Sequence, residues 1–535
     1  MVVLDDGALT LADVAAVARG RAAVRLGDSA RQRMQRSHAW VASAAEGALR
    51  DADGESLPVY GVNTGYGSLA RVRIDHEKIR ELSWNLVRSH AAGVGPRMPD
   101  DAVRGMMLLR ANALSRGASG CRPALVDTLC GMLAAGVVPE VPSRGSCGSS
   151  GDLAPLAHLG LVVFRGTDPH EDVGWAWLDG ERLGASEAMG RAGLQRLVPG
   201  PKEGLAMTNG AQLSCAVAAL MLVDAEELVH AAEIAAAASW EALCGVTRAL
   251  HPEVHKLRPY PGAIAVAADL RSLMEGSSLT DSLPGKVQDA YSLRCTPQVL
   301  GACRDALTYA GRQVSIELNA VTDNPVILVD DPSENKAFSA GLFHGEPVGF
   351  AADHAKLALI ELSALSERRT YRLTTGALSS RLPPLLVTEE GGLGRMMHQA
   401  AAAALVAANR QMATPASADT LPTCEDQEDH VAMSTTAARR AVDVLHNAQQ
   451  VVAIELLCAA SGLWCRQERA AARGETVCLG QGTAAALAAV EEVLGGRGTG
   501  VPSEDIQRVA GLITSGALVR AVEAVSEPLR AVHDG

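Results

Sequence analysis

The sequence has few aromatic residues, no excess of positive charge and no long uncharged apolar run. Aromatic residues make up 3% of the 535 residues, whereas alanine is dense, as at positions 235–238 and 401–404. This composition favours close-packed helices over a β-sandwich. The net charge of −13 argues against a nucleic-acid partner, because nucleic acids are bound mainly through basic contacts. Since no uncharged apolar run reaches the roughly 18 residues of a membrane span, we expect no membrane partner either.

Paired cysteine motifs and a secretion signal are also missing. The 11 cysteines are an odd number and include no Cys-x-x-Cys pair, so neither a disulfide framework nor a zinc knuckle is indicated. The first 20 residues carry Asp5, Asp6 and Asp13 and lack the basic-then-apolar pattern of a signal peptide. We therefore expect a cytoplasmic protein whose thiols pack as small apolar groups in a reducing compartment.

Helical periodicity dominates what is present. Thr10 and Asp13 have the spacing of a capping box, which predicts a first helix that ends near Arg19. Glycines, charges and short β-prone pieces between residues 161 and 200 predict a small sheet or hairpin. Further helices are expected at residues 80–91, 102–115, 124–136, 225–243, 297–319, 348–372, 396–411, 434–463 and 504–525. The chain thus reads as mainly α, with a small mixed N-terminal domain (residues 1–205) followed by a long-helix bundle and C-terminal helical region (residues 206–535).

The stretch from Gly145 to His158 carries unusual chemistry. It reads Gly-Ser-Cys-Gly-Ser-Ser-Gly-Asp-Leu-Ala-Pro-Leu-Ala-His. The amide nitrogen of Gly151 can attack the carbonyl carbon of Ser149 with loss of water, and Ser150 can then lose its hydroxyl. Gly151 suits this closure because it has no Cβ to block the approach. The product is a five-membered ring that bears a methylidene, an electrophile that no ordinary side chain provides.

This run resembles the prosthetic-group motif of the ammonia-lyases and 2,3-aminomutases that use methylidene-imidazolone (MIO). That family usually has Ala-Ser-Gly where this chain has Ser149-Ser150-Gly151. A plain glycine-serine loop before a helix is the alternative, and the length of the match disfavours it. The literal Ala-Ser-Gly at residues 118–120 is interpreted as a structural turn before a helix.

The resemblance extends over essentially the whole chain and implies catalytic roles. The loop at residues 60–67 is similar to the family's inner loop, in which Tyr60 removes the β-proton of the substrate; such a phenol needs a pKa lowered by its surroundings. Asn209 would donate a hydrogen bond to the oxygen of the ring. Arg294 would clamp the substrate carboxylate, and Tyr291 would position the ring or shuttle a proton.

Other matched positions are implied to surround the substrate. Asn324 would be a further carboxylate contact, and Phe343 would flank the ring. Ala408 stands where the family normally carries a glutamate that faces the imidazole of histidine. The segments around His90, His344 and His430 are similar to those of histidine lyases. The remaining implied substrate-binding residues are Gly67, Ser89, Gln288, Glu346 and Gln427.

The resemblance implies an ammonia-lyase acting on an aromatic or heteroaromatic L-amino acid, with histidine named first. It implies the long-helix fold of histidine and phenylalanine ammonia-lyases, MIO formed autocatalytically from Ser149-Ser150-Gly151, no metal or nucleotide, and a homotetramer with active sites shared between subunits. Two alternatives remain open. One is a 2,3-aminomutase that makes a β-amino acid from tyrosine or a related substrate; the other is a catalytically inert structural paralogue, suggested by Ser149 and Ala408.

One pair of histidines could be mistaken for a metal site. His251 and His255 lie one helical turn apart, but Pro252 stands where the glutamate of a His-Glu-x-x-His zinc motif belongs. This segment is therefore predicted to be the start of a helix.

Overall fold

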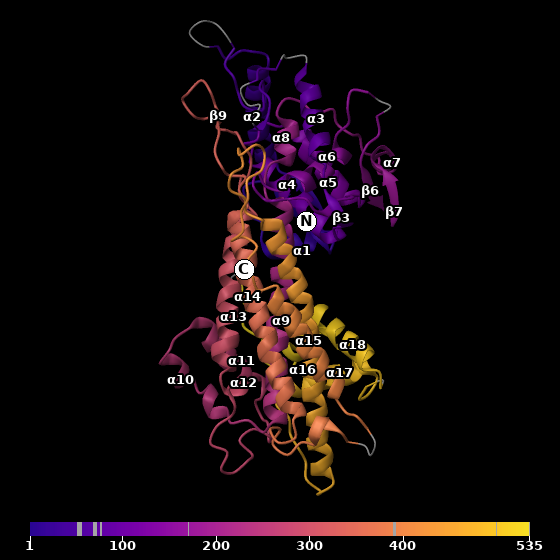
Figure 1. Cartoon of the computed structure of the whole chain (residues 1–535), viewed down its shortest axis with the longest axis vertical. Coiled ribbons are helices and arrows are strands. Elements are labelled where there is room, and N and C mark those ends of the chain that lie inside the picture. The colour runs from indigo at the N-terminus through magenta and orange to yellow at the C-terminus, as the bar shows by residue number, and fades with distance from the viewer. Residues whose placement is uncertain are drawn as a thin grey trace.

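The computed structural model describes residues 1–50, 56–67, 72–74, 78–168, 171–388, 392–498 and 500–533. The molecule is elongated, with a mixed N-terminal part at one end and long helices that run from it to the other end (Figure 1). Helices dominate the described chain, which confirms the expected mainly α fold with a long-helix bundle. The expected domain boundary between residues 205 and 206 stays a prediction.

The N-terminal part combines helices with small sheets. Its helices are α1 (Leu11–Ala18), α2 (Asp28–Ala45), α3 (Ile79–His90), α4 (Asp100–Ser115), α5 (Pro123–Ala135), α6 (Leu153–Val163), α7 (Ala185–Arg191) and α8 (Glu203–Thr208). Its strands are β1 (Val2–Leu4), β2 (Val24–Leu26), β3 (Val94–Arg97), β4 (Val138–Pro139), β5 (Pro142–Arg144), β6 (Trp175–Leu178) and β7 (Glu181–Gly184). β1 and β2 are parallel, β3 pairs antiparallel with β5, and β4, β6 and β7 form an antiparallel sheet. The β6–β7 hairpin confirms the small sheet expected between residues 161 and 200.

Local sequence explains where several of these helices begin and end. Asp13 N donates to Thr10 Oγ1 (3.1 Å) and Thr10 N donates to the Asp13 carboxylate (3.0 Å), so the predicted capping box is present at the start of α1. α5 is followed by Gly136 in the left-handed conformation (φ 78°), which glycine adopts without steric cost. The helices expected at residues 80–91, 102–115 and 124–136 correspond to α3, α4 and α5, each within two residues.

The bundle consists of long helices joined by loops. Its elements are α9 (Gln212–Ala242), η3 (Thr247–Leu250), α10 (Pro252–Lys256), α11 (Pro261–Leu273), α12 (Tyr291–Arg294), α13 (Thr296–Glu317), β8 (Val326–Ile327), β9 (Ala337–Phe338), α14 (Glu346–Thr374), η4 (Pro384–Leu386), α15 (Met396–Gln411), α16 (Ser434–Ala471), α17 (Gln481–Leu494), α18 (Pro502–Thr514) and α19 (Ala517–Glu523). α9 is buried along almost its whole length, because its many alanines allow neighbouring helices to approach closely. α16 packs extensively against both α9 and α14, and these three helices form the centre of the core.

α16 is the one described helix that is long and apolar enough to cross a membrane by length and composition. In its most apolar window, however, 89% of the residues are buried inside the protein, as in the core helix of a bundle. Its polar groups are satisfied inside the core: Glu455 accepts hydrogen bonds from Arg369 (2.5 Å) and from Ser239 Oγ (2.7 Å).

Three expectations differ from the structure, and the first is that α16 continues to Ala471 instead of ending near residue 463. The single helix expected at residues 504–525 is divided into α18 and α19, because Gly516 takes a left-handed conformation (φ 69°) between them. α9 begins at Gln212 rather than near residue 225. The helix start expected at His251 is confirmed: its Nδ1 accepts from Glu253 N (3.2 Å) and caps α10.

Candidate active site

A cavity of about 530 Å³ lies where loops of the C-terminal half meet the N-terminal part. In Figure 1 these loops, coloured orange, rise beside the N-terminal helices above the start of α16. The cavity is lined by residues from segments far apart in the chain: Tyr60, Gly67, Ser149, Ser150, Asn209, Asn324, Ser339, Gly341, Phe343, His344, Cys424, Gln427, Glu428, Asp429 and His430. Many of the site residues expected from the sequence are therefore brought together.

The backbone of residues 148–151 takes a tight conformation that only glycine tolerates at two positions. Gly148 (φ 71°) and Gly151 (φ 80°) are both left-handed. A Cβ on Gly151 would lie 2.2 Å from the carbonyl carbon of Gly210, and one on Gly148 would lie 2.3 Å from Ser434 Oγ. The segment is also held from outside, since Gly345 N donates to Gly148 O (2.9 Å). Its conformation is thus fixed by its surroundings.

The buried carboxylate of Asp152 anchors the same segment. Asp152 is fully buried and accepts hydrogen bonds from Ser146 Oγ (2.7 Å), Ser214 N (2.8 Å) and Thr435 Oγ1 (2.6 Å). These partners connect the loop to the first turns of α9 and α16. The sequence analysis did not single out Asp152 as the hub of this network.

The carbonyl oxygen of Ser150 is met by two donors. Gly210 N donates to it at 3.2 Å. With the amide of Asn209 oriented so that both of its polar atoms are satisfied, Nδ2 donates to Ser150 O (3.0 Å) and Oδ1 accepts from Asn324 N (3.2 Å). Negative charge that developed on this oxygen would therefore be stabilised without reorganisation.

Glu428 is a candidate site residue that the sequence analysis did not single out. Its carboxylate accepts hydrogen bonds from Ser149 Oγ (2.9 Å), Ser150 Oγ (2.5 Å) and Thr423 Oγ1 (2.6 Å). Burial acts to raise the pKa of Glu428, but these three hydroxyls outweigh it and hold the pKa below its ordinary value. The cavity thus contains an ionised carboxylate beside the Ser-Ser-Gly turn.

The expectation for Ala408 stays a prediction. Ala408 is exposed on α15 and lies outside the residues that line the cavity. A single chain therefore does not bring Ala408 to its own cavity. Glu428 could have been identified from its neighbours in the sequence, because residues 427–431 resemble the corresponding loop of histidine lyases.

Tyr60 also lines the cavity, and its phenol oxygen accepts a hydrogen bond. Gly67 N donates to Tyr60 Oη (3.1 Å), and the rings of Tyr60 and Tyr66 meet edge to face at 6.4 Å. Burial raises the pKa of Tyr60, and the charges of Cys424 and Glu428 raise it further, while the Gly67 hydrogen bond opposes them. The lowered pKa expected from the sequence is therefore not produced by the described residues of a single chain.

The Ser89–His90 pair ends α3 near this cavity. His90 Nδ1 lies 2.8 Å from Leu86 O, and Ser89 Oγ also donates to Leu86 O (3.0 Å). Neither residue lines the cavity, but the charge of His90 contributes to lowering the pKa of Glu428. His90 is therefore close enough to influence the site electrostatically.

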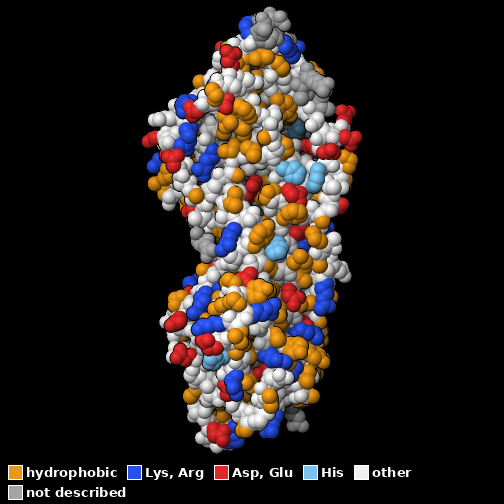
Figure 2. Space-filling model, turned by 90° about the vertical axis from the view of Figure 1, so that its left-hand side faces the viewer, with side chains coloured by type: hydrophobic (Ala, Val, Ile, Leu, Met, Phe, Trp, Pro, Cys, Tyr) orange, Lys and Arg blue, Asp and Glu red, His pale blue; other side chains and the backbone are white. Residues whose placement is uncertain are grey.

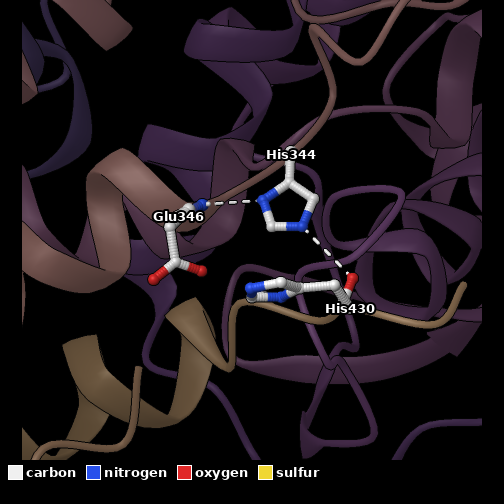
Figure 3. Close-up of side chains that lie close together, drawn as sticks. All are labelled: His344, Glu346 and His430. Atoms are coloured by element: carbon white, nitrogen blue, oxygen red, sulfur yellow. Dashed lines mark hydrogen bonds between the residues drawn. The ribbon is translucent and has the colours of Figure 1, made fainter. Parts of the chain in front are cut away.

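His344, Glu346 and His430 form a cluster at the edge of the cavity (Figure 3). Glu346 N donates to His344 Nδ1 (3.3 Å), and His344 Nε2 lies 3.3 Å from His430 O. Burial raises the pKa of Glu346, whose Oε2 has no hydrogen-bond partner among the described residues. Candidate ligand atoms of the three side chains lie within 4.8 Å of one another, so this group could hold a metal ion.

Three expected site residues lie elsewhere. Gln288, Tyr291 and Arg294 are in or just before α12, which Figure 1 places in the lower half of the molecule. α12 precedes α13, and α13 packs along α14, a helix of 29 residues that spans about 43 Å. Cys303 in α13 lies near Glu361 and Leu362, so α12 is near the end of α14 opposite to the cavity. One chain alone does not bring an arginine from α12 to its own cavity.

The chain is similar to known proteins over its full length. A model of the aromatic amino acid lyase family matches residues 9–492. The histidine ammonia-lyase of Gloeobacter violaceus is 44% identical, over 98% of this chain and 97% of that protein. The solved structure of a tyrosine aminomutase from Streptomyces globisporus matches with a TM-score of 0.89 and 34% identity, over 99% of this chain and 100% of that chain. A histidine ammonia-lyase from Trypanosoma cruzi matches with a TM-score of 0.86 and 32% identity, over 98% and 95%.

Proposed function

We propose, since the chain belongs to the aromatic amino acid lyase family, that it eliminates ammonia from L-histidine to give imidazolyl acrylate. The observation that carries this proposal is the carboxylate of Glu428 in the cavity beside Ser149 and Ser150. A carboxylate held ionised can accept a hydrogen bond from an imidazole N–H. A cavity of about 530 Å³ is within the usual size of small-molecule sites.

The residues present fit an MIO group formed from Ser149-Ser150-Gly151. Closure between Gly151 N and the carbonyl carbon of Ser149 gives a five-membered ring whose exocyclic oxygen is Ser150 O, the atom that Asn209 and Gly210 contact. When present, the group supplies an electrophilic carbon that makes the substrate's amino group a better leaving group. The space around Gly151 admits no Cβ, which matches the requirement for glycine as the attacking residue.

The residues of this chain then have separate tasks. Tyr60, on one side of the cavity, would accept the β-proton of the substrate, and Glu428 would hold the imidazole. Asn209 and the backbone of Gly210 would stabilise negative charge at Ser150 O. Phe343 and Gln427 line the same cavity and would limit how the substrate ring can lie. Asn324 Oδ1 accepts from Ala340 N (2.8 Å), so Asn324 would keep its side-chain amino group for the substrate.

A second copy of the chain would complete the site. Tyr291 is 71% exposed, and its ring lies 4.9 Å from the guanidinium carbon of the half-buried Arg294, whose buried Nε has no hydrogen-bond partner among the described residues. The adjoining helices expose large apolar side chains, including Ile316 and Phe350, which are 67% and 54% exposed, and Figure 2 shows hydrophobic side chains along this side of the bundle. We propose a homotetramer in which Arg294 of one copy binds the substrate carboxylate in the cavity of another. Its positive charge would also lower the pKa of Tyr60.

The substrate assignment is tested by incubating the purified protein separately with L-histidine, L-tyrosine and L-phenylalanine. We expect a conjugated acid from histidine, detected by its ultraviolet absorbance, and equimolar ammonia. Chromatography of the products distinguishes the alternatives. A β-amino acid as the main product would contradict the lyase assignment in favour of an aminomutase, and no turnover of any substrate would favour an inert paralogue.

Replacing Asn209 with alanine tests the contact to Ser150 O. We expect kcat to fall by about 10²- to 10³-fold with little change in KM, because the donor acts mainly when charge develops on the oxygen. Intact mass measured on the same sample shows whether the two waters have still been lost. Asn335→Ala is the matched control, since Asn335 lies outside the cavity and its Oδ1 likewise makes a hydrogen bond with the backbone, accepting from Ala337 N (3.0 Å). An unchanged kcat in Asn209→Ala would show that the amide does not stabilise this charge.

A further inference from the structure

A second cavity, of about 380 Å³, lies next to the segment that leads to Ser149. One wall is formed by the end of β5 and the residues that follow it, including Arg144 and Ser146. The opposite wall is the beginning of α16, with Arg439, Arg440 and Asp443. None of these five residues lines the cavity that contains Tyr60 and Glu428.

The charges around this second cavity do not balance. Three arginines line it, the half-buried Arg439 and the exposed Arg144 and Arg440, together with Asp443. In the part of the chain that the structure describes, no hydrogen bond or ion pair joins Arg144, Arg439 or Arg440 to any acceptor. Other arginines at the protein surface are paired, for example Arg182 with Glu140 (2.6 Å). The chain as a whole has a net charge of −13. A group of three arginines with only one carboxylate among them is unusual in such a chain and favours the binding of an anion.

The positive charges of the three arginines repel one another. Burial lowers the pKa of Arg439, and the charges of Arg144 and Arg440 lower it further, while Asp443 opposes them. An anion placed between the guanidinium groups would remove this repulsion and satisfy donors that now have no acceptor. The guanidinium fork matches the oxygens of a phosphate group in a bidentate manner.

We propose that this cavity binds a phosphate group, either as free phosphate or as part of a phosphate monoester. Arg144, Arg439 and Arg440 supply the charged donors, and the hydroxyl of Thr436 at the start of α16 supplies a neutral one. Three guanidinium groups around one cavity offer donors for several oxygens of a tetrahedral dianion, more than a single planar carboxylate would need. The cavity is larger than phosphate alone requires, so there is space for the organic part of a monoester.

The bound anion would act on the catalytic loop through Ser146. Ser146 lines the cavity, donates to Asp152 Oδ1 (2.7 Å) and accepts from Gly148 N (3.3 Å). Thr435, on the opposite wall, donates to the same carboxylate (2.6 Å). A ligand that bridges β5 and α16 would therefore hold both sides of the Asp152 network in place, and with it the backbone that carries Ser149.

The test is isothermal titration of the full chain, in phosphate-free buffer of low ionic strength, with inorganic phosphate and separately with glycerol 3-phosphate. We expect saturable binding of one anion per chain, weakened by added NaCl. Arg439→Gln and Arg440→Gln should each weaken it about tenfold or more, since each removes a charged donor. Arg410→Gln, at an exposed arginine of α15 outside the cavity, should bind as the wild type does. Tighter binding of the monoester identifies a phosphate monoester as the ligand, whereas equal binding identifies free phosphate.

A second measurement uses the wild-type chain, so its result does not depend on whether the variants fold. Phosphate should protect Arg144, Arg439 and Arg440 from an arginine-selective reagent, as read by peptide mass spectrometry. Absence of saturable binding, binding that persists in both glutamine variants, or no protection would overturn the proposal. If phosphate does not bind and the glutamine variants lose their oligomeric state in light scattering, the arginines contact a second copy of the chain instead. Neither readout depends on catalysis, so both remain valid whatever the substrate is.

Discussion

Ser150→Ala is expected to abolish ammonia release and to leave the chain with the full mass of its sequence. The loss in kcat should be on the order of 10³-fold or more, because the electrophilic carbon comes from the side chain of Ser150 and no other group in the cavity can replace it. The wild-type chain should instead be lighter by two water molecules. Intact-protein mass spectrometry and an ammonia assay on the same preparations measure both effects.

The chain provides its own control for this substitution. Ser119, within the literal Ala-Ser-Gly at residues 118–120, is buried just before α5. It does not line the cavity. Ser119→Ala should keep both the activity and the lower mass. If Ser150→Ala retained activity, or if the wild type carried its full mass while active, the proposed prosthetic group would be wrong.

Mixing two inactive variants is expected to restore activity. Tyr60→Phe lacks the proposed base, and Arg294→Gln lacks the proposed carboxylate clamp, so each homo-oligomer should be nearly inactive. In a mixed oligomer, some cavities would receive an intact Tyr60 from one copy and an intact Arg294 from another. With random mixing, about a quarter of the sites would have both residues, since each is intact with a probability of about one half. Co-expression with two different tags, followed by purification over both, gives the mixed oligomers for assay.

The matched control pairs Tyr60→Phe with Asn209→Ala. Both residues line the cavity of a single chain, so every cavity in that mixture carries one defect and activity should not return. Recovery in the first mixture alone would support a site shared between copies. If the mixed oligomers of Tyr60→Phe and Arg294→Gln formed but stayed inactive, the sharing of Arg294 between copies would be contradicted.

Local features of the fold were predictable from the sequence, because they depend on neighbours in the chain. The capping box of Thr10 and Asp13 determines where α1 begins, and α15 spans the same residues 396–411 that periodicity predicted. The break between α18 and α19 was missed, since an amphipathic pattern continues across Gly516 and does not reveal its backbone conformation.

The composition of the site depends on contacts that periodicity does not encode. Glu428 reaches Ser149 and Ser150 from a loop in which Cys424, Glu425 and Asp426 all have positive φ. A loop of this kind gives no regular pattern in the sequence, whereas the expectation at Ala408 came from the resemblance, which names a position on α15. The resemblance implied active sites shared between subunits, but it does not state which copy supplies each residue. The distance between α12 and the cavity of the same chain was therefore not predicted.

The hydrogen bond from Ser150 Oγ to Glu428 exists only while Ser150 retains its hydroxyl. Maturation of the turn would eliminate that hydroxyl and release one of the three donors that occupy the carboxylate. Under the proposed function, a newly folded chain would thus keep part of its imidazole acceptor occupied by its own precursor. Loss of the hydroxyl would free that part of the carboxylate in the same event that creates the group needed for conversion.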